Sequence, residues 1–310
     1  MCGIIGYIGD QQASPFLIDG LRRLEYRGYD SSGIAVKNGE ISVHKRTGKV
    51  ADLESIIPKN IEGTCGIAHT RWATHGGVTD ANAHPHCSVD GKIALVHNGI
   101  IENARALRNR LEKEGTKLLS ETDSEALVHL IHREVENGAK PLTAVRRTLK
   151  RARGTWGICV VFEDHDMIIC ARNGSPLVIG IGEGENWIAS DTLPLQTLTQ
   201  QVIRLEDGDL AVVTSDGIKT SRFDGRSTDS EVTTLDDDWG EAELGDFPHF
   251  MLKEIHEQPE ALRQCLTGRL AIADGNARLG GLGLSSKKLQ KIPHVRLLGC
   301  GTALHAAQVG

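Results

Sequence analysis

The chain has 310 residues, of which 39% are hydrophobic, 25% are charged and 4% are aromatic, and its formal net charge is −6. This length exceeds the roughly 100 to 200 residues of one domain, so we expect two units. The acidic balance argues against nucleic acid as a partner, because such binding uses a basic surface. No stretch approaches the roughly 18 consecutive apolar residues of a membrane helix, so we expect no membrane partner either.

Seven cysteines are scattered along the chain, with no Cys-x-x-Cys pair. An odd number without paired spacing argues against a disulfide framework and against a zinc or iron–sulfur site. It is typical of a reducing compartment. The amino-terminal segment also lacks the basic and apolar regions of a signal peptide. We therefore expect a cytoplasmic protein.

Apolar runs and their spacing predict elements of both types in the first half of the chain. Residues 3–8 predict a short buried strand, and residues 15–27 predict a helix. Asn38-Gly39 lies between two apolar runs and predicts a hairpin with a type I′ turn, whose central residues both have positive φ. Further along, the pattern predicts strands at 66–68 and 93–96 and helices at 102–114, 122–136 and 141–152.

Strands return in number after residue 156 and are separated by Gly, Asp and Asn turns. Strands and helices thus occur in separate blocks rather than in alternation. This order is typical of antiparallel sheets with helical layers, which is the α+β class. The predicted strands of this part are 158–162, 167–171, 177–181, 187–189 and 210–213.

The chain becomes acidic and poor in apolar residues over 221–246, which predicts a domain boundary. A helix begins at Phe250, and Pro259 is expected to interrupt or end it. A strand from Val295, a glycine turn and a helix start then follow, as at the beginning of an open α/β domain. We expect an amino-terminal domain, a linker with a helical lead-in and a fragment of a second domain, at 2–240, 241–293 and 294–310.

Cys2 follows a methionine that is removable, because the second residue is small. Removal would place a thiol and a free α-amino group on one residue, so a nucleophile and a candidate base would lie a few bonds apart. Their ordinary pKa values, about 8.5 for the thiol and about 7.7 to 8.0 for the amine, need no large shift for chemistry near neutrality. Cys2 is therefore a candidate catalytic residue.

Polar side chains are dense between residues 70 and 99. Arg71 could bind a carboxylate in bidentate fashion, and Asn98 with the amide of Gly99 could donate hydrogen bonds to a developing oxyanion. Asp123 could accept hydrogen bonds from an ammonium group, although capping of a helix explains an acid there equally well. Together, these residues predict a pocket for a zwitterionic substrate.

Four histidines in the same region raise the alternative of a zinc site, with Cys87 as a further ligand. Their spacings match no common zinc motif, so we expect no metal. The four are His75, His84, His86 and His97.

Six ordered motifs resemble the glutamine–fructose-6-phosphate aminotransferase (isomerizing) family, which makes glucosamine 6-phosphate. Residues up to about 240 resemble its glutaminase domain, and those from Val295 resemble the start of its sugar isomerase domain. The motifs are Met1–Ile4, Arg23–Gly33, Thr70–Gly76, Asn82–His86, His97–Asn103 and Gly174–Leu177.

The resemblance implies an N-terminal-nucleophile hydrolase fold, in which two antiparallel sheets stack between two helical layers, αββα. It implies that Cys2 attacks the amide of L-glutamine and that no cofactor takes part. It implies binding of the substrate's α-carboxylate and α-amine by Arg71 and Asp123, and an oxyanion site at Asn98 and Gly99. The substrate-closing loop would contain Trp72, Thr74 and His75, and the supporting residues would be Arg27, His84 and His97.

In the family, the released ammonia reaches the isomerase domain and aminates fructose 6-phosphate, and the full-length protein is expected to be a homodimer. Cys300, Gly301 and Thr302 match the turn beside the sugar phosphate. Ala303 departs from the family's common serine at the next position. Because most of the isomerase domain is absent from this sequence, we expect glutaminase activity and no sugar amination by this chain alone.

Two alternatives remain open at this point. One is another amidotransferase with an amino-terminal cysteine, of the phosphoribosylpyrophosphate or asparagine-forming type. The other is a truncated chain that binds glutamine without turnover. The Tyr26–Asp30 and Thr70–Gly76 motifs favour the aminotransferase over the first alternative.

Overall fold

The computed structural model describes residues 2–58, 61–235, 247–266, 270–271, 276–277, 286–289, 291–299 and 302–309. The chain divides into two compact units, Met1–Ala242 and Glu243–Gly310. Much of the acidic stretch in which we predicted a boundary, residues 236–246, lies outside the described residues.

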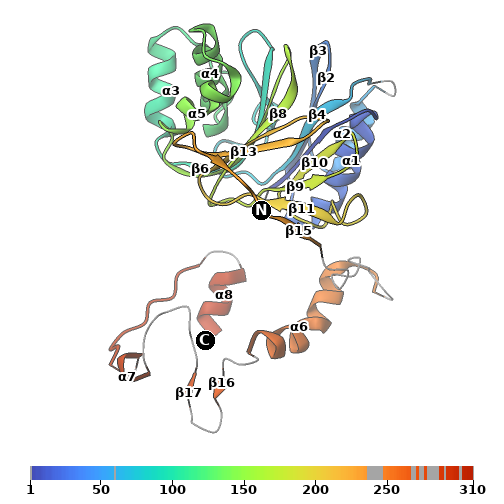
Figure 1. Cartoon of the computed structure of the whole chain (residues 1–310). Coiled ribbons are helices and arrows are strands. Elements are labelled where there is room, and N and C mark those ends of the chain that lie inside the picture. The colour runs from blue at the N-terminus through green and yellow to red at the C-terminus, as the bar shows by residue number, and fades with distance from the viewer. Residues whose placement is uncertain are drawn as a thin grey trace. The chain divides into compact units, whose positions relative to one another are not determined.

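Two antiparallel sheets form the centre of the first unit (Figure 1). One has β1 (Gly3–Ile8), β2 (Ser31–Asn38), β3 (Glu40–Thr47), β4 (Cys65–Arg71), β9 (Val178–Ile181), β10 (Asn186–Ala189), β11 (Gln201–Arg204) and β15 (Val232–Thr234), in the order β15-β11-β9-β10-β1-β4-β2-β3. The other has β5 (His86–Cys87), β6 (Ile93–Ile101), β7 (Gly154–Phe162), β8 (His165–Asn173), β12 (Asp209–Val213), β13 (Ile218–Arg222) and β14 (Ser227–Thr228), in the order β14-β13-β12-β8-β7-β6-β5.

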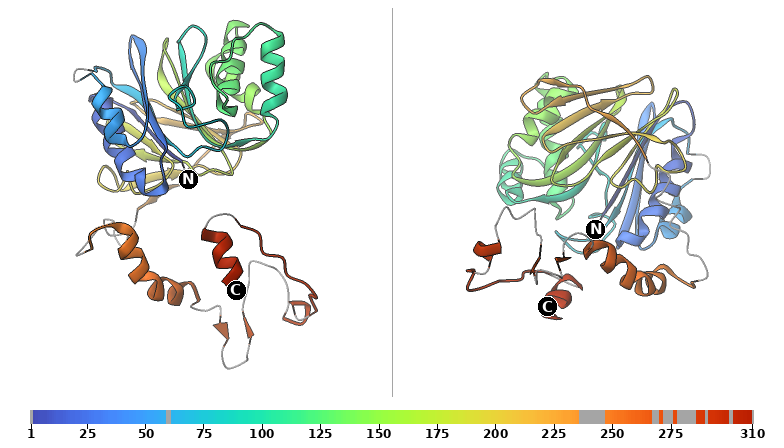
Figure 2. Two further views of the ribbon diagram at one scale, coloured as in Figure 1. Left: turned by 180° about the vertical axis from the view of Figure 1, so that it is seen from behind. Right: turned by 60° about the horizontal axis from the view of Figure 1, so that its bottom comes forward.

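Helices cover the outer face of each sheet, and the view from behind shows the same layers (Figure 2). The helices on the eight-stranded sheet are α1 (Ala13–Leu24), which a short 3₁₀ turn (Glu25–Arg27) continues, and α2 (Val50–Ile56). Those on the seven-stranded sheet are α3 (Ala104–Lys113), α4 (Asp123–Glu136) and α5 (Pro141–Leu149). The order of layers is therefore αββα, which confirms the expected fold.

Three clusters of buried apolar side chains fill the three spaces between these four layers. Strand β1 shows how one element contributes to two of them. Ile4 and Ile8 face the space between the sheets, whereas Ile5 and Tyr7 face α1. Because both faces of the strand are covered, an uninterrupted apolar run replaces the usual alternation of apolar and polar residues.

The hairpin at Asn38-Gly39 is confirmed as β2 and β3, but the expected type I′ turn is wrong. Gly39 has a φ of +72°, whereas no non-glycine residue in the described part of the chain has a positive φ. Pairing continues to Asn38 opposite Glu40, so that Gly39 stands alone at the tip. Only one left-handed residue is needed there, and glycine supplies it without steric cost.

The second unit contains one helix of 17 residues and several shorter elements. Its α6 (Phe250–Leu266) continues through Pro259, contrary to the expected break, so a helix of 17 residues tolerates the loss of one backbone donor. The other elements are β16 (Leu270–Ala271), β17 (Asn276–Ala277), α7 (Ser286–Leu289) and α8 (Thr302–Val309).

The strand predicted from Val295 does not form, and residues 292–299 have no regular secondary structure. A strand depends on hydrogen bonds to a neighbour, and β16 and β17 pair with each other. Val295 and Leu298 are accordingly exposed. No helix in the described ranges has the length and apolar character needed to cross a membrane.

Candidate active site

Cys2 lies immediately before β1, a strand in the interior of the eight-stranded sheet. Its sulfur accepts a hydrogen bond from the backbone N–H of Trp72 over 3.1 Å. Burial raises the pKa of the Cys2 thiol, whereas this hydrogen bond, the terminal amine and the Arg71 charge act to lower it. The thiol is thus mainly protonated at neutral pH, so nucleophilic attack would need a base.

Asn98 and Gly99 lie on β6, in the sheet that faces Cys2. The Asn98 Nδ2 donates to the backbone oxygen of Cys2 over 3.3 Å. Gly99 has a φ of +136°, and a Cβ at this position would lie 2.2 Å from the backbone oxygen of Thr155. Only glycine therefore fits at Gly99, and the close approach of β6 to β7 fixes this end of the site.

Arg71 ends β4, and its guanidinium is buried. It donates to the backbone oxygens of His75 and Gly77, which belong to the loop that follows the strand. The carboxylate of Asp30 lies 3.8 Å from Nη1. Arg71 therefore organises this loop, in addition to any contact with a substrate.

Asp123 is the first residue of α4, and the preceding residue caps the helix. The hydroxyl of Thr122 accepts a hydrogen bond from the N–H of Glu125, which leaves the Asp123 carboxylate for other contacts. One of its oxygens accepts from the N–H of Ile101 over 2.8 Å and lies 3.9 Å from Nδ1 of His75. Capping is therefore not the role of Asp123.

The loop after β4 is polar and partly exposed. Trp72 is 55% exposed, and its ring rests on Gly28, where a Cβ would lie 2.6 Å from the indole. Thr74 and His75 contact each other over 3.4 Å. An exposed indole packed against a glycine can move without disturbing the core.

The histidines of the region do not converge on one point. His84 is buried, and neither ring nitrogen has a hydrogen-bond partner within the described part of the chain. His97 contacts the Ser124 hydroxyl through Nδ1 over 2.8 Å, and His86 contacts the Thr122 hydroxyl through Nε2 over 2.9 Å. Among the described residues, no His, Cys, Asp and Glu side chains form a group of three or more suited to a metal ion.

Most of the predicted site residues line one pocket. Asn98 does not line it but contacts Cys2 directly. The lining consists of Cys2, Arg71, Trp72, Thr74, His75, His84, His97, Gly99, Thr122, Asp123 and Ser124.

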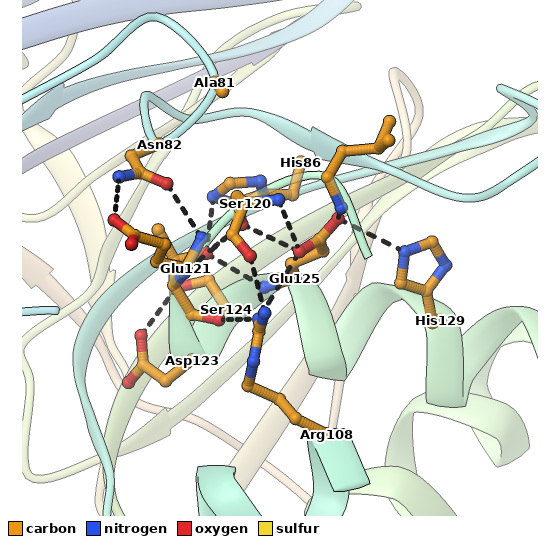
Figure 3. A network of polar contacts seen from close by, with 12 residues as sticks. Ala81, Asn82, His86, Arg108, Ser120, Glu121, Asp123, Ser124, Glu125 and His129 are labelled. Atoms are coloured by element: carbon orange, nitrogen blue, oxygen red, sulfur yellow. Dashed lines mark hydrogen bonds and ion pairs between the residues drawn. The ribbon is translucent and has the colours of Figure 1, made fainter. Parts of the chain in front are cut away.

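Behind the pocket, Glu125 joins the start of α4 to neighbouring elements (Figure 3). Its carboxylate accepts from the backbone of Leu119 and from the backbone and hydroxyl of Ser120, and lies 3.4 Å from Arg108. Burial alone would raise the pKa of Glu125, but the His129 ring, 3.6 Å away, and these hydrogen bonds hold it at about 2. The carboxylate remains ionised and fixes the first turn of the helix.

A second part of this network joins Glu121, in the segment that leads into α4, to the loop after β4 (Figure 3). The side-chain amide of Asn82 donates to the Gly77 oxygen and to the Glu121 carboxylate. Its oxygen accepts from the N–H of Glu121 over 2.9 Å. The loop that contacts Cys2 and the helix that presents Asp123 are thus held together.

Comparison with known proteins identifies the domain to which this pocket belongs. The model of the glutamine amidotransferase domain matches residues 69–197. This range includes the end of β4, the loop after it, β6 and α4, whereas Cys2 precedes it. The chain carries a glutamine amidotransferase domain.

Curated relatives of this chain are named glutamine–fructose-6-phosphate aminotransferase (isomerizing). The protein from Chlorobaculum tepidum is 49% identical, and the match covers 100% of this chain and 52% of the relative. The protein from Thermus thermophilus is 47% identical, over 100% of this chain and 51% of the relative. The chain therefore spans about half the length of the curated relatives that it matches.

Solved structures support the same fold. The glutamine phosphoribosylpyrophosphate amidotransferase of Bacillus subtilis superposes with a TM-score of 0.63 at 27% identity, over 72% of this chain and 49% of that one. A class-II glutamine aminotransferase domain protein from Silicibacter pomeroyi, 18% identical with a TM-score of 0.51, shares the fold alone. The higher identity to the fructose-6-phosphate aminotransferases favours that branch over the phosphoribosylpyrophosphate type.

Arg27, another predicted residue, does not line the pocket. Arg27 is bonded to the backbone oxygen of Ser190 and to the Asp191 carboxylate, 3.2 Å away. Ser190 in turn pairs with Ile4 on β1, so Arg27 supports the strand that follows Cys2. Cys300 and Gly301 lie outside the described residues, and Thr302 begins α8 but its side chain is not described.

Sequence reasoning missed His69 and Glu125. His69 lies between Ile67 and Arg71 on β4, and Ile67 packs between the sheets. Because alternate residues of a strand share a face, the same spacing places His69 toward the seven-stranded sheet. The acidic residues around Glu125 show no comparable spacing, because the groups that contact the Glu125 carboxylate come from several parts of the chain.

Proposed function

We propose that this chain hydrolyses L-glutamine to glutamate and ammonia through a γ-glutamyl thioester on Cys2, after removal of Met1. The observation that carries the proposal is the position of the Cys2 sulfur, 3.1 Å from the Trp72 amide in a pocket that Asp123 and Arg71 also line. Such a pocket offers a nucleophile together with one group of each charge for a zwitterionic substrate.

In the first half of the reaction, the α-amine of Cys2 accepts the thiol proton, and the thiolate adds to the side-chain amide carbon of glutamine. The C=O electron pair moves to oxygen, and Nδ2 of Asn98 and the N–H of Gly99 donate to the resulting oxyanion. The carbonyl then re-forms, the C–N bond breaks, and the ammonium of Cys2 returns its proton to the leaving nitrogen. Ammonia and the thioester are the products.

In the second half, the same amine accepts a proton from water as the water oxygen adds to the thioester carbon. The C–S bond breaks, the thiol is restored, and glutamate is released. Arg71 would bind the α-carboxylate and Asp123 the α-ammonium throughout. Trp72, Thr74 and His75 would close over the substrate, and His84 and His97 would support the pocket rather than transfer protons.

The experiment measures glutamate release from glutamine by the purified chain, with removal of Met1 verified by intact mass. We expect turnover that Cys2→Ala abolishes and Cys87→Ala preserves, since Cys87 is a half-buried cysteine outside the pocket. Release that survives Cys2→Ala would overturn the mechanism. No release from a folded, Met1-free chain would instead favour a glutamine-binding role without turnover.

For a protein that also has a complete isomerase domain, we propose that the ammonia aminates fructose 6-phosphate. Support comes from the names of the relatives, which match this chain along its full length. Cys300, Gly301 and Thr302 would then contribute to the sugar-phosphate site, and the complete protein would form a homodimer. The five cysteines whose side chains the structure describes are free, which agrees with a cytoplasmic location. The test adds fructose 6-phosphate and measures glucosamine 6-phosphate.

A further inference from the structure

His69 connects the two sheets through Asn98, the residue whose amide contacts Cys2. It lies on β4 of the eight-stranded sheet and has no exposed surface. Its Nε2 lies 2.9 Å from Oδ1 of Asn98 and 3.1 Å from the backbone oxygen of His97, both on β6 of the other sheet. One ring nitrogen therefore contacts two acceptors on the strand that presents Asn98.

The backbone oxygen of His97 determines which nitrogen of His69 carries the proton. A carbonyl oxygen can only accept, so Nε2 has to be the donor. The other nitrogen, Nδ1, has no hydrogen-bond partner within the described residues. His69 is therefore the Nε2–H tautomer, and its single N–H is shared between two oxygens.

The tautomer of His69 in turn determines the rotation of the Asn98 amide. If the amide were turned over, its NH₂ group would face the N–H of His69, and two donors would oppose each other. With Oδ1 toward His69, the NH₂ group faces Cys2 and donates to its backbone oxygen over 3.3 Å. The fixed backbone oxygen of His97 on β6 thus sets the tautomer of His69. That tautomer in turn sets the rotation of the Asn98 amide beside Cys2.

We propose that His69 is a positioning residue that fixes the Asn98 amide with its NH₂ group toward the reacting carbonyl of glutamine. The proposal rests on the proposed glutaminase function, because the oxyanion that Asn98 would bind forms in that reaction. A donor aimed in advance at a developing charge stabilises the transition state without reorganisation. His69 would supply this orientation without contact with the substrate.

The surroundings keep the His69 ring neutral, as the role requires. Its pKa is lowered to about 3, mainly by burial and in addition by the nearby His97 and Arg71 charges, while the hydrogen bond to Asn98 acts in the opposite direction. The ring of His84 lies against it at a centroid distance of 4.2 Å. A second proton on Nδ1 would have no acceptor within the described part of the chain.

The kinetic test compares His69→Phe, which keeps an aromatic ring without the donor, with His69→Gln, which keeps an N–H donor. Removing one oxyanion donor costs about 100-fold or more in kcat, so we expect His69→Phe to lower kcat by about 10-fold or more. The KM for glutamine should change little, since the oxyanion exists only in the transition state. His69→Gln should recover part of kcat, and His165→Phe, at the exposed start of β8, should have no effect.

Asn98→Ala separates positioning from general support of the fold. If His69 acts through Asn98, His69→Phe should cost nothing further in the Asn98→Ala background. Multiplicative losses in the double variant, or a loss confined to KM, would overturn the proposal. A wild-type chain without Cys2-dependent turnover would instead contradict the proposed function.

The ring nitrogens of His69 give a readout that is independent of activity. Nitrogen NMR of the wild-type chain should show a protonated Nε2 and an unprotonated Nδ1 at neutral pH. This measurement remains available if the variants do not fold. A protonated Nδ1, or an imidazolium at neutral pH, would contradict the assignment.

Discussion

The backbone N–H of Trp72 lies 3.1 Å from the sulfur of Cys2 and donates a hydrogen bond to it. Trp72 begins the loop that Arg71, Asn82 and Glu121 attach to the rest of the site. A rearrangement of this loop at Trp72 would therefore change a hydrogen bond to the Cys2 sulfur. The loop and the thiol should respond together to substitutions and to pH.

The Cys2 thiol should react with iodoacetamide at a rate that increases with pH. The thiolate is the reactive form, and burial raises the thiol pKa, so the rate should reach half of its maximum above the ordinary value of about 8.5. Mass spectrometry of the amino-terminal peptide measures the rate, and a short peptide with the same sequence is the control. A midpoint below that of the peptide would show that the pocket lowers the pKa.

Arg71→Ala should weaken glutamine binding. Loss of a buried charged partner costs about 2 to 5 kcal/mol, and the loop also loses two hydrogen bonds. Arg71→Lys keeps the charge but not the planar fork, so it should recover only part of the affinity. Glutamine KM and thermal stability are measured for both, with the exposed Arg22→Ala as control. An unchanged KM would disprove carboxylate binding by Arg71.

Gly99→Ala should destabilise the protein and abolish turnover, whereas Gly91→Ala serves as a matched control. Both glycines have positive φ, so each substitution introduces backbone strain of about 1 kcal/mol. Only at Gly99 would the Cβ also collide with the backbone, 2.2 Å from the Thr155 oxygen. Thermal unfolding should show the larger loss for Gly99→Ala. Equal losses would contradict the steric argument.

Glu125 should make stability sensitive to acid. Its pKa in the folded protein is about 2, below the ordinary value of about 4.3, so its contribution is complete above about pH 4.3 and is lost as the pH falls toward 2. Glu125→Gln should remove this part of the pH dependence. Denaturant unfolding at several pH values between about 5 and 2, where carboxylates titrate, measures this contribution to the free energy of unfolding. The exposed Glu183→Gln should match the wild type throughout.

The sequence was sufficient to predict those helices, strands and turns that are specified by the pattern of their own residues. Strand β1 and helix α4 follow from apolar spacing, and the β2–β3 hairpin follows from Asn38-Gly39. The type I′ turn was wrong because the pairing register, which is a tertiary property, left one residue rather than two at the tip.

The residues of the candidate site were predictable where they lie in recognisable sequence motifs. The reactive side chains of Cys2, Arg71 and Asp123 stand in recognisable runs, and the structure brings them to one pocket. His69 contacts Asn98 on another strand, and Glu125 contacts Arg108 on α3. The local sequence does not report such partners. The strand expected at Val295 failed because its hydrogen bonds would come from strands elsewhere in a sheet.

The central claim is that Cys2 forms a covalent thioester with glutamine. Intact mass and peptide mapping of the Met1-free chain, quenched in acid during turnover, test it most directly. We predict one added glutamyl group on the amino-terminal peptide, sensitive to hydroxylamine and absent from Cys2→Ala. Steady glutamate release by a chain on which no such adduct forms, together with activity of Cys2→Ala, would contradict the account.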